Sequence, residues 1–150
     1  MKIIYKINTA SFEEIFMHLQ QCNKNFVPCL ESRIDLEVFA RKIYSLAITF
    51  EAWCSSELVG FLSAYFNDPG RHAGFINHLS ILEVYQRQSI AENLLNMATS
   101  YAGERDFNKI LLEVDKRNFK AIRLYKKTGF VEEGSRGNVT CNKLLIKRIF

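Results

Sequence analysis

Cysteine and proline are scarce in this sequence, and no long apolar run is present. The 150 residues include four cysteines and two prolines. No two cysteines have C-x-x-C spacing, so we expect no zinc or other metal site. Nothing after Met1 resembles a signal peptide, which favours free thiols in the cytoplasm over the two disulfides that an even number would also allow. The apolar runs are far shorter than a membrane span, so we expect a cytoplasmic protein without a membrane partner.

A strong charge of either sign is also missing. Twenty basic and sixteen acidic residues give a formal net charge of +4. This excess is too mild to indicate a nucleic-acid-binding protein, although it is compatible with an anionic cofactor. No internal repeat or low-complexity tract divides the chain. Its length therefore predicts one domain over residues 1–150, with a substantial core.

The first part of the chain predicts one strand followed by two helices. Lys2–Ile7 is expected to be a short strand. Ser11 and Glu14 have the spacing of a capping box, and apolar residues then recur at helical spacing to residue 22. After a loop over Asn23–Arg33, Asp35 is placed to cap a second helix.

The rest of the chain predicts a mixed sheet. Three strands with short turns indicate an antiparallel meander, and the next strand has the continuous apolar pattern of a parallel strand covered on both faces. The strands are predicted at Ala47–Trp53, Leu58–Phe66, Ala73–Leu82, Lys109–Asp115, Phe130–Glu133 and Lys143–Ile149, with helices at 90–105 and 118–128 and a connection at Gly134–Asn142. The order βααβββαβαββ fits an α/β fold with helices on both faces of one sheet.

The stretch Gln86–Ala91 is a polar loop between a predicted strand and a predicted helix. The first N–H groups of a helix have no partner within the helix, and the positive end of the helix dipole lies there. Such a loop can bind a phosphate or pyrophosphate. Considered alone, it is better explained as a simple strand-to-helix turn.

Two motifs together resemble those of the GNAT (GCN5-related) N-acetyltransferases. Gln86 and Ala91 match the family's acyl-CoA-binding pattern Gln/Arg-x-x-Gly-x-Gly/Ala, whereas Ser89 stands where glycine is usual. The stretch Asn118–Phe130 matches Asn-x-x-Ala-x-x-x-Tyr-x-x-x-Gly-Phe. The close resemblance covers roughly residues 58–134, and it implies a GNAT-like fold and an enzyme that transfers an acetyl group from acetyl-CoA to an amine.

The resemblance also implies roles for individual residues. Tyr125 would be the general acid that protonates the departing thiolate, although a tyrosine on an apolar helix stripe is commonly a core residue. Asn118 would cap its helix, contact the cofactor, or do both. The backbone at Leu79–Ile81 would pair with the pantetheine arm, which requires a bulge or a splay between neighbouring strands. The implied cofactor-binding residues are Leu79, Ser80, Ile81, Gln86, Arg87, Gln88, Ser89, Ile90, Ala91, Asn118, Ala121 and Tyr125.

The two motifs say less about the site that would bind the acceptor amine. Family members often carry an acidic residue or histidine just before the position of Leu79, and here Asn77 and His78 occupy it. His78 can accept a proton near neutral pH, but a lone histidine on a strand is more often structural. In the resemblance, the helix pair and the loop that contains Phe26 would overlie the acceptor, or they would simply cover the sheet. We expect Phe26, Asn77 and His78 to contact it.

The acceptor itself remains open at this stage. A small amine such as an amino sugar or polyamine is expected, because no histone- or ribosome-specific motif is present. Protein N-termini or lysines are the alternative, and a non-catalytic acyl-CoA-binding module is a further one. An exposed edge at strand 143–149 would permit a homodimer.

Overall fold

The computed structural model describes residues 2–23, 35–135 and 142–149, and it contains the predicted order of strands and helices. A 3₁₀ turn, η3, is added between the third strand of the meander and the following helix. The elements are β1 (Ile4–Ile7), α1 (Phe12–Cys22), α2 (Leu36–Leu46), β2 (Ile48–Cys54), β3 (Glu57–Tyr65), β4 (Ala73–Ile81), η3 (Glu83–Tyr85), α3 (Ile90–Glu104), β5 (Lys109–Asp115), α4 (Phe119–Lys127), β6 (Val131–Ser135) and β7 (Asn142–Arg148).

Local signals in the sequence set several helix ends. Ser11 and Glu14 form both hydrogen bonds of the predicted capping box at the start of α1. The Asp35 carboxylate caps α2 by accepting from two backbone N–H groups. α4 stops at Lys127, and Gly129 adopts a φ of 104°, which a residue with a Cβ adopts only with strain.

The strands form a seven-stranded mixed sheet in the order β1-β2-β3-β4-β5-β7-β6. The predicted three-stranded meander, β2 to β4, is antiparallel, and β4 pairs with β5 in parallel, as predicted. β1 adds a further antiparallel strand beside β2. β7 lies between β5 and β6, so the prediction that strand 143–149 offers an exposed edge is wrong. The edge strands are β1 and β6, because the chain returns from β6 into the position beside β5.

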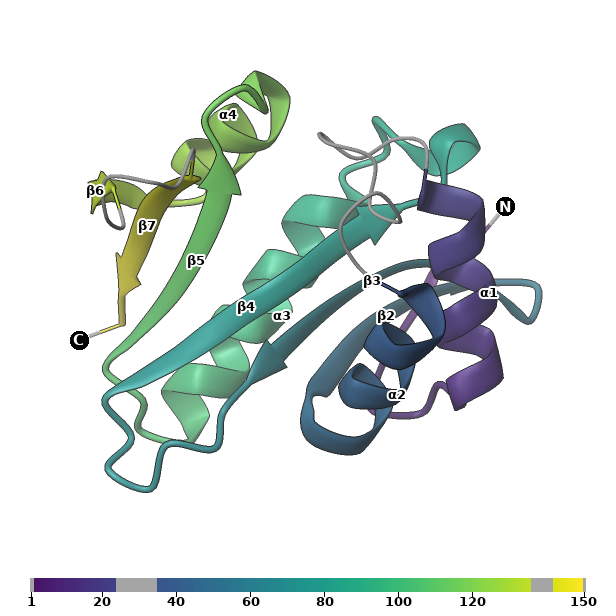
Figure 1. Ribbon diagram of the computed structural model, residues 1–150, viewed down its shortest axis with the longest axis horizontal. Helices are drawn as coiled ribbons and strands as arrows, with labels where there is room; N and C mark the ends of the chain where they lie inside the picture. Colours follow the sequence, from purple (N-terminus) through teal and green to yellow (C-terminus); the bar gives the residue numbers. More distant parts are fainter. Residues whose placement is uncertain (1, 24–34, 136–141, 150) are drawn as a thin grey trace.

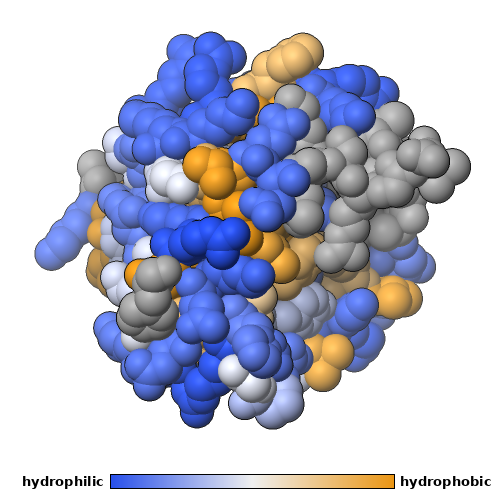
Figure 2. Space-filling model, turned by 90° about the vertical axis from the view of Figure 1, so that its left-hand side faces the viewer, coloured by the Kyte–Doolittle hydropathy of each residue, from blue (hydrophilic) through white to orange (hydrophobic). Residues whose placement is uncertain are grey.

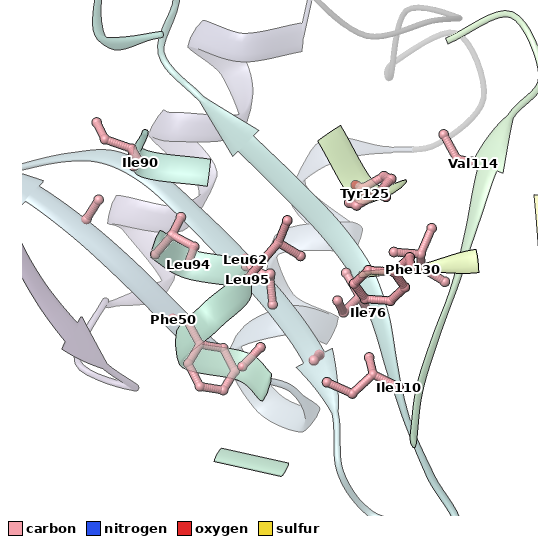
Figure 3. Close-up of a cluster of buried hydrophobic side chains, with 14 of the residues drawn as sticks. Phe50, Leu62, Ile76, Ile90, Leu94, Leu95, Ile110, Val114, Tyr125 and Phe130 are labelled. Atoms are coloured by element: carbon pink, nitrogen blue, oxygen red, sulfur yellow. The ribbon is translucent and has the colours of Figure 1, made fainter. Parts of the chain in front are cut away.

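Helices cover the two faces of the sheet, with α1 and α2 in front and α3 behind in Figure 1. Each face has its own cluster of buried side chains. α3 and α4 pack on one face, around Phe50, Leu62 and Phe130, and several of these residues appear in Figure 3. α1 and α2 pack on the other face, around Trp53 and Phe61.

The predicted burial of strand 109–115 on both faces is wrong. Ile110, Leu112 and Val114 are buried, whereas Leu111 and Glu113 between them are only half-buried. The reason is that α1 and α2 pack over β2 and β3 and do not extend across β5. The connection predicted at 134–142 is shorter at both ends, because β6 continues to Ser135 and β7 begins at Asn142.

The surface on the side of β5, β7 and β6 is mostly hydrophilic, with a strip of hydrophobic residues through its centre (Figure 2). None of the helices within the described ranges combines the length and the apolar character that crossing a membrane requires.

Candidate active site

The sheet opens between β4 and β5. The two strands are paired from Ala73 and Lys109 only as far as Ile76 and Leu112, and beyond that point they diverge toward α4 (Figure 1). The pairing of β3 with β4 also shifts by one residue, so that Asn77 is an extra residue in β4. A bulge of this kind bends the strand that carries it. Both the bulge and the splay that binding along Leu79–Ile81 would require are therefore present.

A pocket of about 610 Å³ occupies the region of this opening. It is formed by the end of β4, the loop that leads into α3, the first turn of α3, and one face of α4. The pocket is lined by Cys22, Leu79, Ser80, Ile81, Glu83, Tyr85, Gln86, Arg87, Ser89, Ile90, Ala91, Glu92, Asn118, Lys120, Ala121, Leu124, Tyr125 and Lys127. The two motifs that are distant in the sequence thus share one pocket. Of the twelve predicted cofactor-binding residues, only Gln88 is not among the lining residues.

The loop before α3 has an unusual backbone. Arg87 and Ser89 have φ angles of 65° and 62°, in the left-handed region. This conformation is the physical reason for glycine in the family motif at the position of Ser89, because a Cβ is strained there. Ser89 is the N-cap of α3, but its hydroxyl makes no capping hydrogen bond. A serine therefore holds a glycine-like conformation in the lining of the pocket.

The first turn of α3 has backbone N–H groups without a backbone acceptor. The first N–H in this helix with an i−4 partner is that of Asn93, which donates to Ser89 O at 3.0 Å. Among the described residues, the N–H groups of Ile90, Ala91 and Glu92 have no backbone acceptor. Together with the helix dipole, these donors suit an anionic group.

The side chain of Gln86 joins the loop to the end of β4 and to α4. Its Nε2 donates to Ile81 O at 3.2 Å, and its Oε1 accepts from Lys120 Nζ at 2.9 Å. A second bridge joins α3 to α4, because Lys127 Nζ lies 3.0 Å from Glu92 Oε1. Lys120 was not among the predicted site residues. Its position inside the Asn118–Phe130 motif was the signal that could have identified it.

Tyr125 lies on the inner face of α4, in the opening between β4 and β5 (Figure 3). Its residue surface is 9% exposed, and its ring packs edge-to-face on Phe130 at 5.8 Å between centroids. Burial raises the pKa of Tyr125 to about 12. The phenol is therefore protonated at neutral pH. Two turns earlier, at the start of α4, Asn118 Oδ1 accepts from Ala121 N at 3.2 Å, so Asn118 caps α4 as predicted and also lines the pocket.

The residues expected at the acceptor lie on the other face of β4 or outside the pocket lining. His78 is 7% exposed, and the rings of Phe61 and Phe39 pack on it at 5.0 and 5.6 Å. Asn77, the bulged residue, accepts from Ser63 Oγ at 2.7 Å. Phe26 belongs to the segment 24–34 and lies outside the described residues.

Two residues that sequence reasoning did not select meet Ser80 beneath α1. His18 Nε2 lies 2.8 Å from Ser80 Oγ, and Cys22 Sγ lies 3.4 Å from the same nitrogen. The His78 Nε2 also lies 2.8 Å from Ser80 Oγ. The available signal was that His18 stands on the apolar stripe of helix 11–22, where a polar side chain needs a buried partner.

Cys22 and His18 do not form a reactive thiolate–imidazolium pair. Burial lowers the pKa of His18 to about 4 and raises the pKa of Cys22 to about 11. Both groups are therefore neutral near pH 7. A nucleophilic cysteine needs the opposite shift, toward the thiolate, so Cys22 is not activated as a nucleophile.

The comparisons with known proteins agree with this geometry. Residues 7–130 match the model of the acetyltransferase (GNAT) family. The fold is similar to that of the PaiA N-acetyltransferase from Thermoplasma acidophilum, solved in complex with coenzyme A, with a TM-score of 0.76, 17% identity and coverage of 99% of each chain. An aminoglycoside 6′-acetyltransferase type Ii gives a TM-score of 0.79 at 18% identity, covering 100% of this chain and 98% of the other.

A third similar structure is the ribosomal-protein-S18-alanine N-acetyltransferase from Escherichia coli, with a TM-score of 0.74, 17% identity, and coverage of 97% of this chain and 94% of the other. At these identities the structures show a shared fold. The match to the family model over residues 7–130 shows the family. The chain is therefore an acetyltransferase of the GNAT family, which uses acetyl-CoA as its acetyl donor.

Proposed function

We propose that this chain transfers an acetyl group from acetyl-CoA directly to a primary amine of a small molecule, such as an amino sugar or a polyamine. The observation that carries the proposal is the position of Tyr125. This tyrosine places a protonated, buried phenol in the pocket where β4 and β5 separate. A proton donor at this point is what acyl transfer with a thiolate leaving group requires.

The pocket has the chemistry to hold coenzyme A. The N–H groups at the start of α3 and the hydroxyl of Ser89 face a site suited to the pyrophosphate, and Lys120 adds a positive charge. The edge of β4 over Leu79–Ile81 is not paired with β5, so its backbone groups suit the amide groups of the pantetheine arm. Acetyl-CoA, when bound, supplies the activated acetyl group.

Tyr125 and His78 have complementary proposed roles. The hydroxyl of Tyr125 holds the proton that the sulfur takes as it leaves. His78 accepts the proton of the attacking amine, because a free alkyl amine has a pKa near ~10 and is protonated at neutral pH. Asn77 has no basic group, and its amide is hydrogen-bonded to Ser63 and Tyr65.

The enclosure of His78 supports a small acceptor. The residue is 7% exposed, and Phe39 from α2 and Phe61 from β3 pack on its ring. A small amine fits such surroundings better than a folded protein surface does. A panel of amino sugars, polyamines and peptides with free N-termini tests this part. Transfer confined to the peptides would overturn the small-molecule acceptor and leave the acetyltransferase chemistry in place.

The role of Tyr125 is tested with Tyr125→Phe, which keeps the ring and removes the hydroxyl. The expected result is a fall in kcat of about 10²-fold or more, with the affinity for acetyl-CoA nearly unchanged. Tyr101→Phe is the matched control, because Tyr101 is a half-buried tyrosine of α3 that packs on Phe50 and Phe66 outside the pocket. A Tyr125→Phe enzyme that turns over at the wild-type rate would contradict the assignment.

A further inference from the structure

Lys120 stands at a position in α4 that does not favour a cation. It is the second residue of the helix, directly after Phe119, and Asn118 is the N-cap. The first turn of a helix carries the positive end of the helix dipole, so a positive side chain there lowers helix stability. The first turn of α4, all of which the structure describes, contains no acidic residue that would offset this charge. The position of Lys120 therefore points to a role other than stabilising α4.

The pocket receives the positive ends of two helices. Ser89, the N-cap of α3, and Asn118, the N-cap of α4, both line it. Lys120 lines the same pocket and adds a full positive charge to these partial charges. An anionic group bound here interacts favourably with both helix ends and with the lysine.

The two lysines of α4 that line the pocket differ in how their charge is balanced. Lys127 Nζ lies 3.0 Å from Glu92 Oε1, so this lysine is already paired with a carboxylate. Lys120 Nζ donates instead to the neutral amide oxygen of Gln86 at 2.9 Å. Within the described ranges, Lys120 forms no ion pair and donates to no other acceptor. An ammonium group has three N–H donors, and the described contacts use one of them.

Gln86 holds the ammonium group of Lys120 beside the loop that precedes α3. Its Nε2 donates to Ile81 O at 3.2 Å, and this hydrogen bond fixes the direction of the amide. Oε1 of the same amide then accepts from Lys120 Nζ. A lysine side chain has many rotamers, and a side chain that is held in place before the ligand arrives loses less entropy on binding.

We propose that Lys120 binds the pyrophosphate of acetyl-CoA, and that Gln86 positions Lys120 for this contact. The inference rests on the part of the proposed function that places the pyrophosphate at the start of α3. Lys120 Nζ keeps its hydrogen bond to Gln86 and uses its other N–H donors for the phosphate oxygens. The site thereby prefers donors that carry a pyrophosphate over donors that consist of the pantetheine arm alone. Gln86 is a positioning residue, and its effect on this preference depends on Lys120.

Three ligands separate this role from that of a structural tie between α4 and the loop. They are CoA, 3′-dephospho-CoA, which keeps the pyrophosphate, and pantetheine, which has no phosphate. Calorimetry with the full chain measures the dissociation constants of the first two, and competition with CoA gives that of pantetheine. Lys120→Met removes the charge and keeps a long side chain. We expect it to weaken the binding of CoA and of 3′-dephospho-CoA by about tenfold, and to leave the affinity for pantetheine unchanged.

Matched variants and salt test whether the effect is electrostatic. Lys120→Arg keeps the charge and is expected to retain most of the preference for CoA over pantetheine. Lys126→Met is the control, because Lys126 is an exposed residue of α4 that pairs with Glu132 at 3.9 Å and does not line the pocket; we expect it to bind all three ligands as the wild type does. The wild-type preference for CoA is expected to fall between about 0.05 M and about 0.5 M salt, because salt screens exposed charges, and to fall less in Lys120→Met.

A double-mutant cycle tests the positioning role of Gln86. Gln86→Met removes the amide and is expected to lower the preference for CoA over pantetheine. In the Lys120→Met background the same substitution is expected to leave that preference unchanged, because Gln86 then has no ammonium group to hold. An equal fall in both backgrounds would show that Gln86 acts on its own and would contradict this part of the proposal.

Two outcomes for Lys120→Met would overturn the pyrophosphate contact. Equal weakening of CoA and pantetheine would show that Lys120 is a structural tie. Weaker binding of CoA with unchanged binding of 3′-dephospho-CoA would assign Lys120 to the 3′-phosphate. Neither outcome affects acetyl transfer, which Tyr125→Phe and the amine panel test. A wild-type protein that shows the expected binding but acetylates no amine would keep this inference and overturn the proposed function.

Discussion

The buried imidazole of His18 makes a quantitative prediction about stability and pH. Its residue surface is 2% exposed, and burial lowers its pKa from 6.5 to about 4. In the unfolded chain the same group binds a proton at about pH 6.5. Between these two values the unfolded state binds more protons than the native state, so the free energy of unfolding rises with pH over this window. The stabilisation is complete above pH 6.5 and is lost as the pH falls to 4.

The size of the effect follows from the shift in pKa. One pKa unit corresponds to about 1.4 kcal/mol, so a shift from 6.5 to about 4 corresponds to about 3 kcal/mol between pH 7.5 and pH 4. The perturbation is His18→Gln, which removes the titrating group and keeps polar atoms at the site. The assay is urea unfolding at pH 4, 5, 6, 7 and 7.5 with linear extrapolation to water.

The comparison isolates His18, because the carboxylates that titrate in this range are common to both proteins. The wild type is expected to lose about 3 kcal/mol more than His18→Gln between pH 7.5 and pH 4. His72→Gln is the control, since the His72 side chain is 75% exposed, and we expect it to follow the wild type. The same pH dependence in the wild type and in His18→Gln would refute the view that His18 is buried in its neutral form.

Three further predictions concern other positions. Glu51→Ala is expected to lower the free energy of unfolding by about 1–3 kcal/mol for each donor that it leaves unsatisfied, because the fully buried carboxylate accepts from the backbone of Thr9 and Ala10 and from Trp53. Urea unfolding would measure this loss, and a loss below about 1 kcal/mol would contradict the prediction. Ser89 and Ser56 both have φ angles in the left-handed region. Ser89→Gly and its control Ser56→Gly are each expected to raise the free energy of unfolding by about 0.5–1 kcal/mol, because the strain is relieved. Only Ser89→Gly is expected to tighten acetyl-CoA binding in a titration, and equal binding by both would show that the Cβ of Ser89 does not matter. Gly129→Ala is expected to lower the free energy of unfolding by about 1–2 kcal/mol, because φ is 104° and a Cβ would lie 3.1 Å from Lys147 Cε. Thermal unfolding would measure this change, and an unchanged melting temperature would argue against the strain.

Much of the fold was predictable because its signals are local. The capping box at Ser11, the cap at Asp35 and the stop at Gly129 depend on residues within one helical turn, and all three are confirmed. The periodicity of apolar residues located the strands and helices to within about two residues. Strand 143–149 was misjudged as an edge, because the neighbours of a strand depend on how the chain crosses the sheet, and no local pattern records that.

The candidate site divides in the same way. The motifs identified the pocket residues around Gln86 and Tyr125, because those residues are close together within each motif. Lys120 was missed although it stands inside a motif, since its partner Gln86 lies on another element. His18 was missed because its partners, Leu58 and Ser80, belong to two different strands.

The sequence by itself determined the order of elements, the helix ends, the family resemblance and the residues of each motif, because these depend on periodicity and spacing along the chain. Only the tertiary structure decided where β4 and β5 separate. Their pairing ends at Ile76, next to the bulge at Asn77 that bends β4. The tertiary structure also decided which face of β4 carries His78, and it alone joined His18 to Ser80. Hydrogen bonds between side chains distant in sequence depend on packing to within a few tenths of an ångström, and the spacing of residues along a chain does not specify that.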